Sequence, residues 1–348
     1  MRILKKHKWL TAIAAIVLLT GTIGYLNRSA IALWAFDTFL SADVQKKLEK
    51  SYKTLEGREP AQVSHKEDKK PFSLLLLGID QRGHERGRSD TMIYTVVRPV
   101  DRMMLMVSIP RDSYVEIPGR AKGDKITHAY VYGKAKLAIE TVEKLFDTRL
   151  DHYAAINFEG FRDVIDAMGG IALPIEKDLV NDDPYHEKFV VKAGQNRYNG
   201  KDALNYVRYR EDVGGDVSRT QRHQIFITAL LDKATEFGQW TKIPQLIDIM
   251  GDNFTTDLAP DDMIDLAKSM VKTGDRTLYS HTLKGEGRRS SSNGLWYYYL
   301  DEADLEKAKS WINSWMNDSL TKAQLPIPDP HQTKRPAQSL PVSEVVQP

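Results

Sequence analysis

The sequence predicts an α/β layered domain behind a single N-terminal transmembrane helix. Three observations lead to this fold class. Residues 9–26 carry no charge and follow a cluster of basic residues. A continuous apolar run, FSLLLLGI, is typical of a strand that is buried on both faces. Beyond it, strand-like and helix-like segments alternate along the chain, as they do in layered α/β domains.

The N-terminal apolar run has the length of a membrane anchor. About 20 apolar residues span a bilayer core, and the stretch at 9–27 nearly reaches that length. Because basic residues before a span stay inside, we expect a cytoplasmic tail at 1–8, a single-pass signal-anchor at 9–27 and an extracellular remainder. The alternative is a cleavable signal peptide, since Ala30-Ile31-Ala32 resembles a cleavage site.

The remaining elements follow from composition and periodicity. Segment 28–70 is rich in Lys, Glu and Gln, which predicts a solvated juxtamembrane helix or stalk. The folded domain is expected over 71–320, and the Pro-rich segment 321–348 is expected to be a disordered tail. Strands are expected at 71–80, 91–100, 103–110, 152–158, 169–176 and 294–301. Helices are expected at 134–146, 159–168, 200–208 and 220–237, in two segments after residue 239, and in a final stretch ending at residue 316.

Composition excludes several classes of protein. The 348 residues are 41% hydrophobic, so the chain can bury a full core. The net charge of +2 argues against a global field that attracts nucleic acid. The absence of cysteine excludes disulfides, thiolate metal sites and a cysteine nucleophile. The sequence contains no Walker loop, G-x-S-x-G elbow or H-E-x-x-H zinc motif.

The segment YVRYREDVGGDVSRTQRHQ, at 206–224, concentrates arginines around a Gly-Gly turn. Ser218 followed by Gln221 is a capping-box pattern, so we expect a helix to start at Ser218 with Arg219 in its first turn. A cation there faces the positive end of the helix dipole, which an anion would relieve. Guanidinium groups match phosphate oxygens bidentately. The segment therefore predicts a phosphate site formed by Arg208, Arg210, Arg219 and Arg222, with His223 beside them.

The alternative for this segment is a solvated basic face neutralised by neighbouring acids. Glu211, Asp212 and Asp216 supply the negative charge. These acids lie in the Gly-Gly loop and not on the arginine face of the helix, which favours the phosphate interpretation.

Two aspartates flank the loop after the first strand. Asp80 ends that strand and Asp90 begins the next, a pairing that suits a hard divalent cation such as Mg²⁺. The alternative is that both are turn-forming aspartates beside glycines, a common use of this residue. Arg82 and Arg88 in the same loop are either phosphate ligands or solvated charges.

Arg111 follows the third strand and would lie at the same edge of the sheet as Asp80 if the two strands are neighbours. Its alternative role is a surface ion pair with the adjacent Asp112, worth about 0–1 kcal/mol. The aromatic run at 296–299 is more typical of a strand core than of a sugar-binding platform.

Taken in order, six motifs resemble the LytR-CpsA-Psr family of cell-envelope enzymes of Gram-positive bacteria. They cover roughly residues 72–316. The motifs are LLLLGIDQR, RSDTM, SIPRDSYVEIPG, KITHAYVYG, DHYAAINFEGFRDVIDAMGGI and GKDALNYVRYR with DVSRTQRHQ. The resemblance implies one membrane helix and an extracytoplasmic three-layer α/β/α domain with a mixed central sheet. It also implies transfer of an anionic glycopolymer, such as wall teichoic acid, from undecaprenyl diphosphate to peptidoglycan, with Mg²⁺ (or Mn²⁺) assisting.

The resemblance also assigns roles to residues. Asp80 and Asp90 would hold the metal and, with Arg111, form the catalytic group. The pyrophosphate would be bound by Arg82, Arg111, Arg208, Arg210, Arg219, Arg222 and His223. Three positions depart from the family pattern: His223 stands where glutamine is frequent, Ser218 where glycine is usual, and Tyr132 where a small residue is usual.

A mechanism without an enzyme nucleophile follows from these roles. A sugar hydroxyl of peptidoglycan would attack phosphorus, and Asp80 or Asp90 would take its proton. The polyprenyl tail needs an apolar tunnel, which we expect between the sheet and the helices. Alternative functions are a lipid-pyrophosphate pyrophosphatase that uses water as acceptor, and a non-catalytic envelope regulator. Nucleic-acid binding is not expected.

Overall fold

The computed structural model describes residues 38, 40–58, 70–81, 87–182, 187–209, 215–234, 242–271 and 277–328. For 215–221, 224, 252 and 269–271 it describes the backbone alone. No helix within these ranges has both the length and the apolarity needed to cross a bilayer. The predicted cytoplasmic tail and the signal-anchor segment at 9–27 lie outside them.

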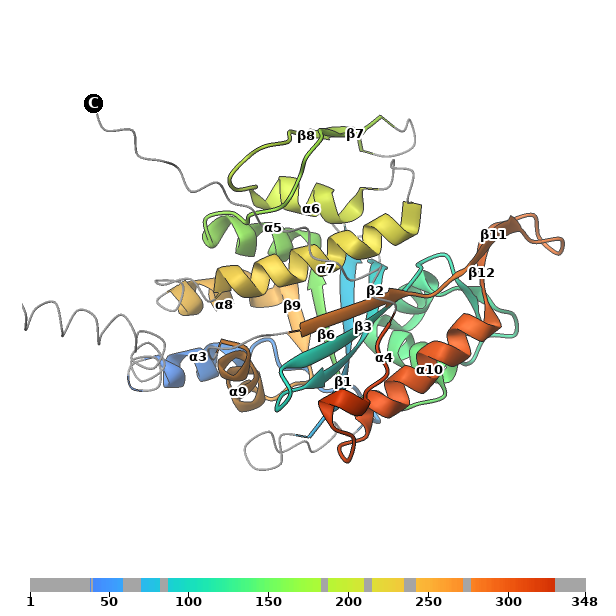
Figure 1. Cartoon of the computed structure of the whole chain (residues 1–348), viewed down its shortest axis with the longest axis horizontal. Coiled ribbons are helices and arrows are strands. Elements are labelled where there is room, and N and C mark those ends of the chain that lie inside the picture. Colours follow the sequence, from blue (N-terminus) through green and yellow to red (C-terminus); the bar gives the residue numbers. More distant parts are fainter. Residues whose placement is uncertain are drawn as a thin grey trace, which may run out of the picture.

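A six-stranded mixed sheet forms the centre of the molecule (Figure 1). Its order is β10-β3-β2-β1-β6-β9. β1 pairs antiparallel with β2 and parallel with β6, while β3 pairs antiparallel with β2 and parallel with β10. This confirms the prediction of a mixed α/β fold. The strands are β1 (Phe72–Asp80), β2 (Arg88–Arg98), β3 (Met103–Ile109), β6 (His152–Asn157), β9 (Phe254–Thr256) and β10 (Thr277–Thr282).

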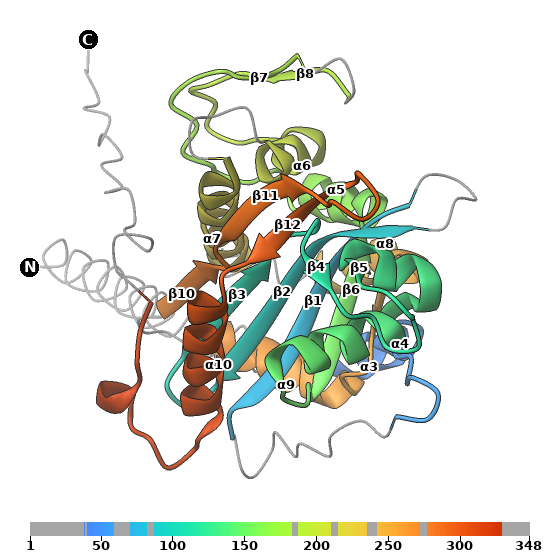
Figure 2. The ribbon, with the colours of Figure 1, turned by 90° about the vertical axis from the view of Figure 1, so that its right-hand side faces the viewer.

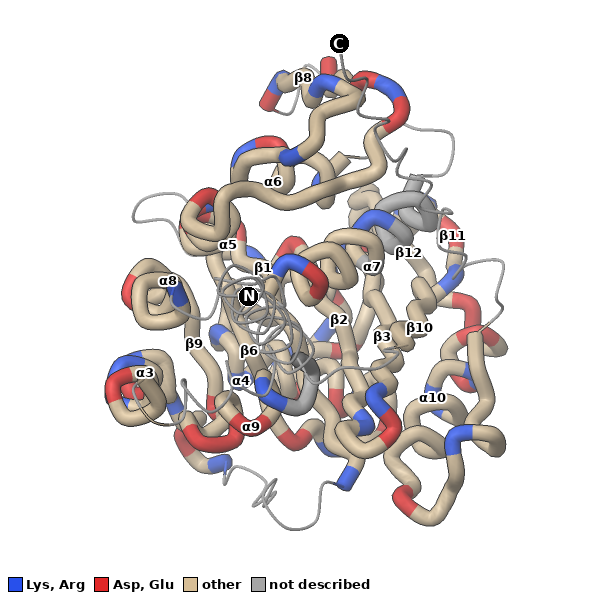
Figure 3. Tube along the Cα trace, turned by 60° about the vertical axis from the view of Figure 1, so that its left-hand side comes forward, with Lys and Arg blue, Asp and Glu red and all other residues tan. Residues whose placement is uncertain are grey.

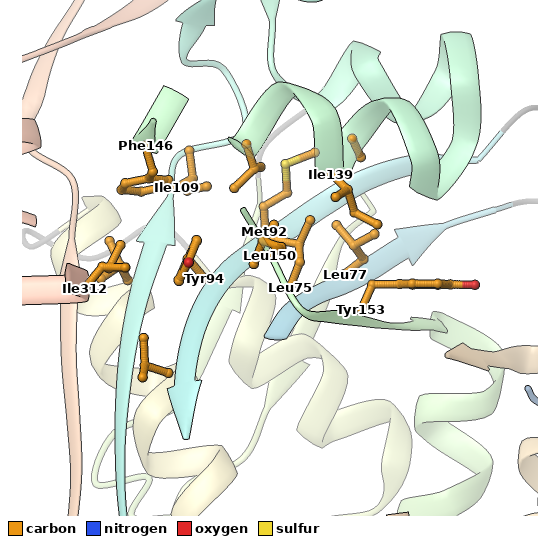
Figure 4. Close-up of a cluster of buried hydrophobic side chains, with 14 of the residues drawn as sticks. Leu75, Leu77, Met92, Tyr94, Ile109, Ile139, Phe146, Leu150, Tyr153 and Ile312 are labelled. Carbon is orange, nitrogen blue, oxygen red and sulfur yellow. The ribbon is translucent and has the colours of Figure 1, made fainter. Parts of the chain in front are cut away.

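One face of the sheet packs tightly against helices α4 (Thr127–Phe146) and α10 (Glu302–Met316). Side chains alternate across a strand, so Leu75 and Leu77 of β1 point to this face. They pack with Ile139 of α4 and Trp315 of α10, all of them almost fully buried. Figure 4 shows this cluster between the strands and the helices. This face contains the main hydrophobic core of the domain.

The other face packs against helices α7 (Gly215–Ala234) and α9 (Pro260–Val271). Phe72 and Leu74 of β1 point to it and are buried. Farther along the same strand, Leu76 is only half-buried. Helices thus lie on both faces of the sheet, in three layers. The second interface becomes less tightly packed toward the end of β1.

A second cluster of helices packs beside the sheet. Helices α5 (Phe158–Ala167) and α6 (Gly200–Arg208) share an apolar cluster with α7. Both start at asparagine caps: Asn157 accepts a hydrogen bond from the amide of Gly160, and Asn199 accepts one from the amide of Asp202. A two-stranded arm, β7 (Leu179–Asn181) and β8 (Phe189–Val191), lies beyond α6 (Figure 1).

Two small hairpins complete the described fold, together with helix α3 (Ser41–Leu48) and helix α8 (Ile243–Met250). Val44 and Leu48 of α3 are buried in a cluster that includes Ile247 of α8. The helix expected in a solvated stalk therefore exists, but one of its faces packs on the domain. The hairpins are β4 (Tyr114–Val115) with β5 (Asp124–Lys125), and β11 (Gly285–Arg289) with β12 (Trp296–Leu300). Basic and acidic positions are mixed over the helices and turns (Figure 3), in agreement with the small net charge.

Most predicted elements are present, but three expectations were wrong. Helix α7 begins at Gly215, so Ser218 lies inside the helix and Arg219 is beyond its first turn. The expected strand at 169–176 makes only an isolated bridge, between Ile171 and Tyr198. Its residues follow two glycines with φ near +80° and contain Pro174, which has no amide hydrogen to donate to a ladder.

The third wrong expectation concerns the first part of the predicted tail, 321–328; the rest of that segment, 329–348, lies outside the described residues. Residues 321–328 fold back on α10 and include a short 3₁₀ helix at Lys322–Gln324. Leu325 is buried in the main core, and Nε1 of Trp315 donates to the carbonyl of Pro326 at 2.8 Å. The packed structure therefore extends past residue 320. Helix α4 also begins earlier than expected; its first part joins the predicted helix at a kink, where Gly133 and Lys134 leave helical geometry.

Candidate active site

Three of the predicted site residues lie at one edge of the sheet. β2 is antiparallel to both β1 and β3, so its first residues lie beside the last residues of those two strands. This places Asp80 at the end of β1, Asp90 near the start of β2 and Arg111 just after β3 at a common edge. The expectation of a shared edge is confirmed, although β1 and β3 are not neighbours, because β2 lies between them.

Asp90 occupies an irregular position in its strand. Gly78 pairs with Thr91 and Ile79 pairs with Ser89, which leaves Asp90 as the additional residue of a β-bulge. A bulge bends the strand and redirects a side chain, and bulges are frequent beside active sites. The hydroxyl of Thr127, at the start of α4, donates to the carbonyl of Ser89 at 3.0 Å. The bulge is thereby attached to the tightly packed face of the domain.

Arg111 lies between two carboxylates. Its Nη1 is 3.0 Å from Oδ1 of Asp90, and its Nε is 3.6 Å from Oδ2 of Asp112. Nζ of Lys125 is in turn 2.8 Å from Oδ1 of Asp112. The result is an alternating row of charges, Asp90, Arg111, Asp112 and Lys125, with partly exposed side chains. The row holds the guanidinium of Arg111 at the strand edge before any ligand arrives.

Arg208 reaches the same edge from the helical side. It is the last residue of α6, where a cation is favourable because of the helix dipole. Its guanidinium lies 4.9 Å from the ring centroid of Phe158, the residue that follows β6. Its Nη1 is also 3.9 Å from Oε2 of Glu187. β6 runs parallel to β1 and pairs with it up to Ile79, so both strands end at the same edge of the sheet. Arg208, which contacts the residue after β6, therefore lies at the edge where β1 ends with Asp80.

Arg222 and His223 hold the end of α6 in place. Nη1 of Arg222 donates to the carbonyl of Tyr209 at 2.8 Å, and Nε2 of His223 lies 3.0 Å from the carbonyl of Val207. Carbonyls at a helix C-terminus need such external donors. Arg222 is buried, which lowers its pKa, while the neighbouring Tyr206 has its pKa raised to about 12 by burial. These contacts position the segment that carries Arg208.

The structure does not place the whole predicted clamp. Asp80 is half-buried at the end of β1, opposite Arg88. Arg82 and Arg210 lie outside the described residues, and for Arg219 the backbone alone is described, within α7. Of the predicted residues, Asp90 and Arg111 are in direct contact, and Arg208 lies at the same edge of the sheet.

Sequence reasoning missed a second polar group beside this edge. Oδ2 of Asp124 lies 2.9 Å from Nδ1 of His128 and accepts a hydrogen bond from the hydroxyl of Tyr132 at 2.8 Å. Partial burial raises the pKa of Asp124, but the contacts with His128 and Tyr132 lower it more, so the net pKa is below its usual value. Lys125 belongs to the same stretch. The available signal was that all four residues fall within or next to the KITHAYVYG motif.

Asp80 and Asp90 are the candidate metal ligands at the edge. Among the described residues, no three His, Cys, Asp or Glu side chains gather in a way that would hold a metal ion. Mg²⁺ typically takes one or two carboxylates and completes its shell with waters and substrate phosphate oxygens. Two carboxylates on neighbouring strands match that donor set.

Comparison with known proteins agrees with the motifs. A model of the LytR_cpsA_psr family matches residues 38–313. A Bacillus licheniformis protein named polyisoprenyl-teichoic acid–peptidoglycan teichoic acid transferase TagU is 36% identical over 323 residues, which cover 91% of this chain and 98% of the relative. A protein of the same name from Enterococcus faecalis is 34% identical over 279 residues, covering 79% and 89%.

Solved structures show the same fold. TagT bound to LIIa-WTA superposes with a TM-score of 0.62 at 29% identity, covering 76% of this chain and 99% of that chain. Bacillus subtilis TagU superposes with a TM-score of 0.55 at 32% identity, covering 73% and 100%. Because the family model spans most of the folded region and two relatives exceed one-third identity over most of the chain, this chain belongs to the LytR-CpsA-Psr family.

Proposed function

We propose that this chain is a phosphotransferase that moves an anionic glycopolymer, such as wall teichoic acid, from undecaprenyl diphosphate to peptidoglycan. The observation that carries the proposal is the contact of 3.0 Å between Arg111 and Asp90, formed at a β-bulge on the sheet edge that Arg208 also reaches. The names of the relatives, which describe teichoic acid transfer to peptidoglycan, support the same class of enzyme.

The reaction is a displacement at phosphorus. A sugar hydroxyl of peptidoglycan attacks the phosphorus that bears the glycopolymer, and a new P–O bond forms. The P–O bond to undecaprenyl phosphate breaks, and that lipid phosphate leaves. The proton of the hydroxyl passes to a carboxylate at the edge, Asp80 or Asp90. Positioning and charge neutralisation account for most of the catalysis in such transfers, so no enzyme nucleophile is needed.

Arginines supply the positive charge for this step. The guanidinium of Arg111 is held in place by Asp90 and Asp112, so it requires little reorganisation when phosphate oxygens arrive. Arg208 approaches from α6, and the contacts of Arg222 and His223 fix the end of that helix. Mg²⁺ or Mn²⁺, held by Asp80 and Asp90, would neutralise further charge on the pyrophosphate. Arg82, Arg210 and Arg219 belong to the same proposed clamp.

The polyprenyl chain would lie against the face of the sheet that packs on α7 and α9. Along this face, burial decreases from Phe72 through Leu74 to Leu76, toward the end of β1 that carries Asp80. Ala154 and Ile156 of the neighbouring β6 are also half-buried. These half-buried apolar side chains would supply apolar contacts to the polyprenyl chain next to the site. The predicted anchor at 9–27 would hold the domain outside the cell, close to the bilayer that contains the lipid.

A transfer assay with a defined lipid-linked donor tests the proposal. The full-length protein in detergent is given the donor with and without a peptidoglycan acceptor, and attached and free polymer are measured. Arg111→Ala is expected to lower the transfer rate by about 10²-fold, the typical effect of removing one group that stabilises transition-state charge. The matched control is Lys144→Ala, which breaks an exposed ion pair with Glu116 of 2.8 Å far along α4 and should leave the rate unchanged.

Full activity of the Arg111 variant would disprove its role in the clamp. Release of free polymer at the same rate with and without acceptor would instead identify a pyrophosphatase. No turnover of any donor by the wild-type protein would favour the non-catalytic regulator.

A further inference from the structure

Hairpins β4–β5 and β11–β12 are separate two-stranded sheets that lie side by side next to the candidate active site. Ser113 bridges to Tyr298 in parallel, and the amide of Tyr298 donates to the carbonyl of Asp112 at 2.9 Å. Figure 1 shows the β11–β12 hairpin standing away from the central sheet, and Figure 2 shows β4 beside β12. The two hairpins therefore form an accessory surface attached directly to the segment that follows Arg111.

This surface exposes large aromatic side chains. Trp296 is 42% exposed, Tyr132 is 40% exposed and Tyr114 is 39% exposed. The ring centroid of Tyr114 lies 5.0 Å from that of Tyr297 and 5.5 Å from that of Tyr299, so these three tyrosines form one cluster. Among the described residues, Trp296, Tyr132 and Tyr114 are the only exposed aromatic side chains, and all three lie in this region.

Glycines hold two of these rings in position. A Cβ atom at Gly123 would lie 2.6 Å from Cζ of Tyr114, and one at Gly287 would collide with the indole of Trp296. Each ring therefore packs against a glycine backbone and is still partly exposed to solvent. Such fixed rings lose little conformational entropy when a ligand stacks on them. The arrangement is that of a preformed binding platform.

Cations accompany the rings. The guanidinium of Arg120 lies 4.0 Å from the ring centroid of Tyr132, and that of Arg288 lies 4.2 Å from the ring centroid of Tyr299. Nζ of Lys125 is 5.9 Å from the ring centroid of Trp296. The surface therefore combines flat apolar faces with positive charge.

Lys125 connects this surface to the reaction site. Its Nζ is 2.8 Å from Asp112, whose other oxygen is 3.6 Å from Nε of Arg111, and Arg111 contacts Asp90. A short row of ion pairs thus connects the aromatic surface to Asp90, one of the two carboxylates that would receive the acceptor's proton. A polymer bound on these rings would reach the edge of the central sheet that carries Asp90 and Arg111.

We propose that this region, which exposes Tyr114, Tyr132 and Trp296 and carries Arg120, Lys125 and Arg288, binds the glycan strand of peptidoglycan. Pyranose rings present apolar C–H faces that stack on aromatic rings, and the carboxylates of the peptide stems match the cations. A polyol-phosphate chain would satisfy the cations but has few faces to stack, so the rings favour the acceptor over the donor polymer. The inference rests on the proposed transferase function, since it assigns the acceptor site of that reaction.

Co-sedimentation with purified peptidoglycan freed of teichoic acid tests the assignment. The full-length protein in detergent is used as wild type, Trp296→Ala, Trp296→Phe and Arg288→Glu. Trp296→Ala is expected to bind about five- to tenfold more weakly, the loss of one aromatic stack, and Trp296→Phe should recover most of the binding. Val190→Ala is the matched control, because Val190 is an exposed apolar residue on the other projecting hairpin, β7–β8.

Thermal unfolding of each variant shows whether it is folded. If Trp296→Ala does not fold, the test depends on Arg288→Glu, which changes only an exposed charge. Unchanged binding by the folded variants, or no binding by wild type, would overturn the acceptor site. So would displacement of peptidoglycan by free teichoic acid polymer with the same dependence on Trp296. Donor turnover by wild type in the presence of the peptidoglycan acceptor is measured separately. Its absence would count against the proposed function and leave the binding result to be judged on its own.

Discussion

The two faces of the central sheet are built differently from the same strands. On the α4 and α10 side, Leu75 and Leu77 of β1 lie in a closed apolar core with almost no exposed surface. On the α7 and α9 side, the intervening Leu76 and its β6 partner Ala154 are half-buried, while its β2 partner Ile93 is buried. The first face stabilises the domain, whereas the second leaves small side chains and incomplete packing beside the proposed site.

Under the proposed function, this difference would let one domain be stable and also bind a lipid. Buried apolar area is the main source of folding free energy, and the closed face contains most of it. The other face can then be less densely packed without unfolding the domain. Substitutions on the two faces should therefore differ in size and in kind.

The largest effect is expected for Trp315→Ala on the closed face. Trp315 is fully buried, packs edge-on to Tyr279 at 5.7 Å and donates to the carbonyl of Pro326. Removing it should lower the free energy of unfolding by about 3–5 kcal/mol, the usual cost of a Trp-to-Ala change in a core. Urea denaturation of the full-length protein in detergent measures the change. A loss below about 1 kcal/mol would mean that this face is not the main core.

A matched pair on β1 compares the faces directly. Leu77→Ala should cost about 2–5 kcal/mol, because it opens a cavity in a closed core. Leu76→Ala, one residue away and half-buried, should cost about 1 kcal/mol, in proportion to the smaller apolar area it covers. Leu76→Ala should also change the affinity for the polyprenyl donor, while Leu77→Ala should change it less. Equal losses of stability would contradict the proposed asymmetry.

The smallest effect is expected for Thr95→Val on the second face. The hydroxyl of Thr95 is buried and has no hydrogen-bond partner among the described residues. Replacing it with a methyl group should raise the free energy of unfolding by about 1 kcal/mol, since an unsatisfied buried hydroxyl is costly. Thr141→Val on α4 is the control, because that hydroxyl donates to the carbonyl of Leu137 at 2.6 Å. A gain of stability in the control alone would refute the interpretation.

Much of the fold was predictable because its strands and helices have strong local patterns. The apolar run at 72–79, the asparagine cap at Asn199 and the Gly-Gly break after α5 each specify local geometry with little help from the rest of the chain. The start of α7 was misplaced because a capping-box pattern also occurs inside helices. Strands β9 and β10 were missed because they depend on pairing with strands that are distant in the sequence.

The candidate site was predictable in its residue types and less so in its arrangement. Asp90 and Arg111 were named from their positions at strand ends, and their contact of 3.0 Å fits that placement. The bulge that presents Asp90 was not visible, because it results from a register shift between two strands. The role of His223 was also hidden: it depends on a carbonyl of α6 that approaches only when α6 and α7 pack together.

The sequence by itself indicated the candidate site residues and determined most of the segments that become strands and helices, because periodicity and cap residues act over a few positions. The tertiary structure alone decided which face of the sheet closes and which stays loosely packed, since alternating side chains are sorted by the helices that cover them. It also decided that the run at 296–299 exposes Trp296 and buries Tyr297. A strand pattern specifies that neighbouring side chains point to opposite sides, and only packing determines which of the two sides meets solvent.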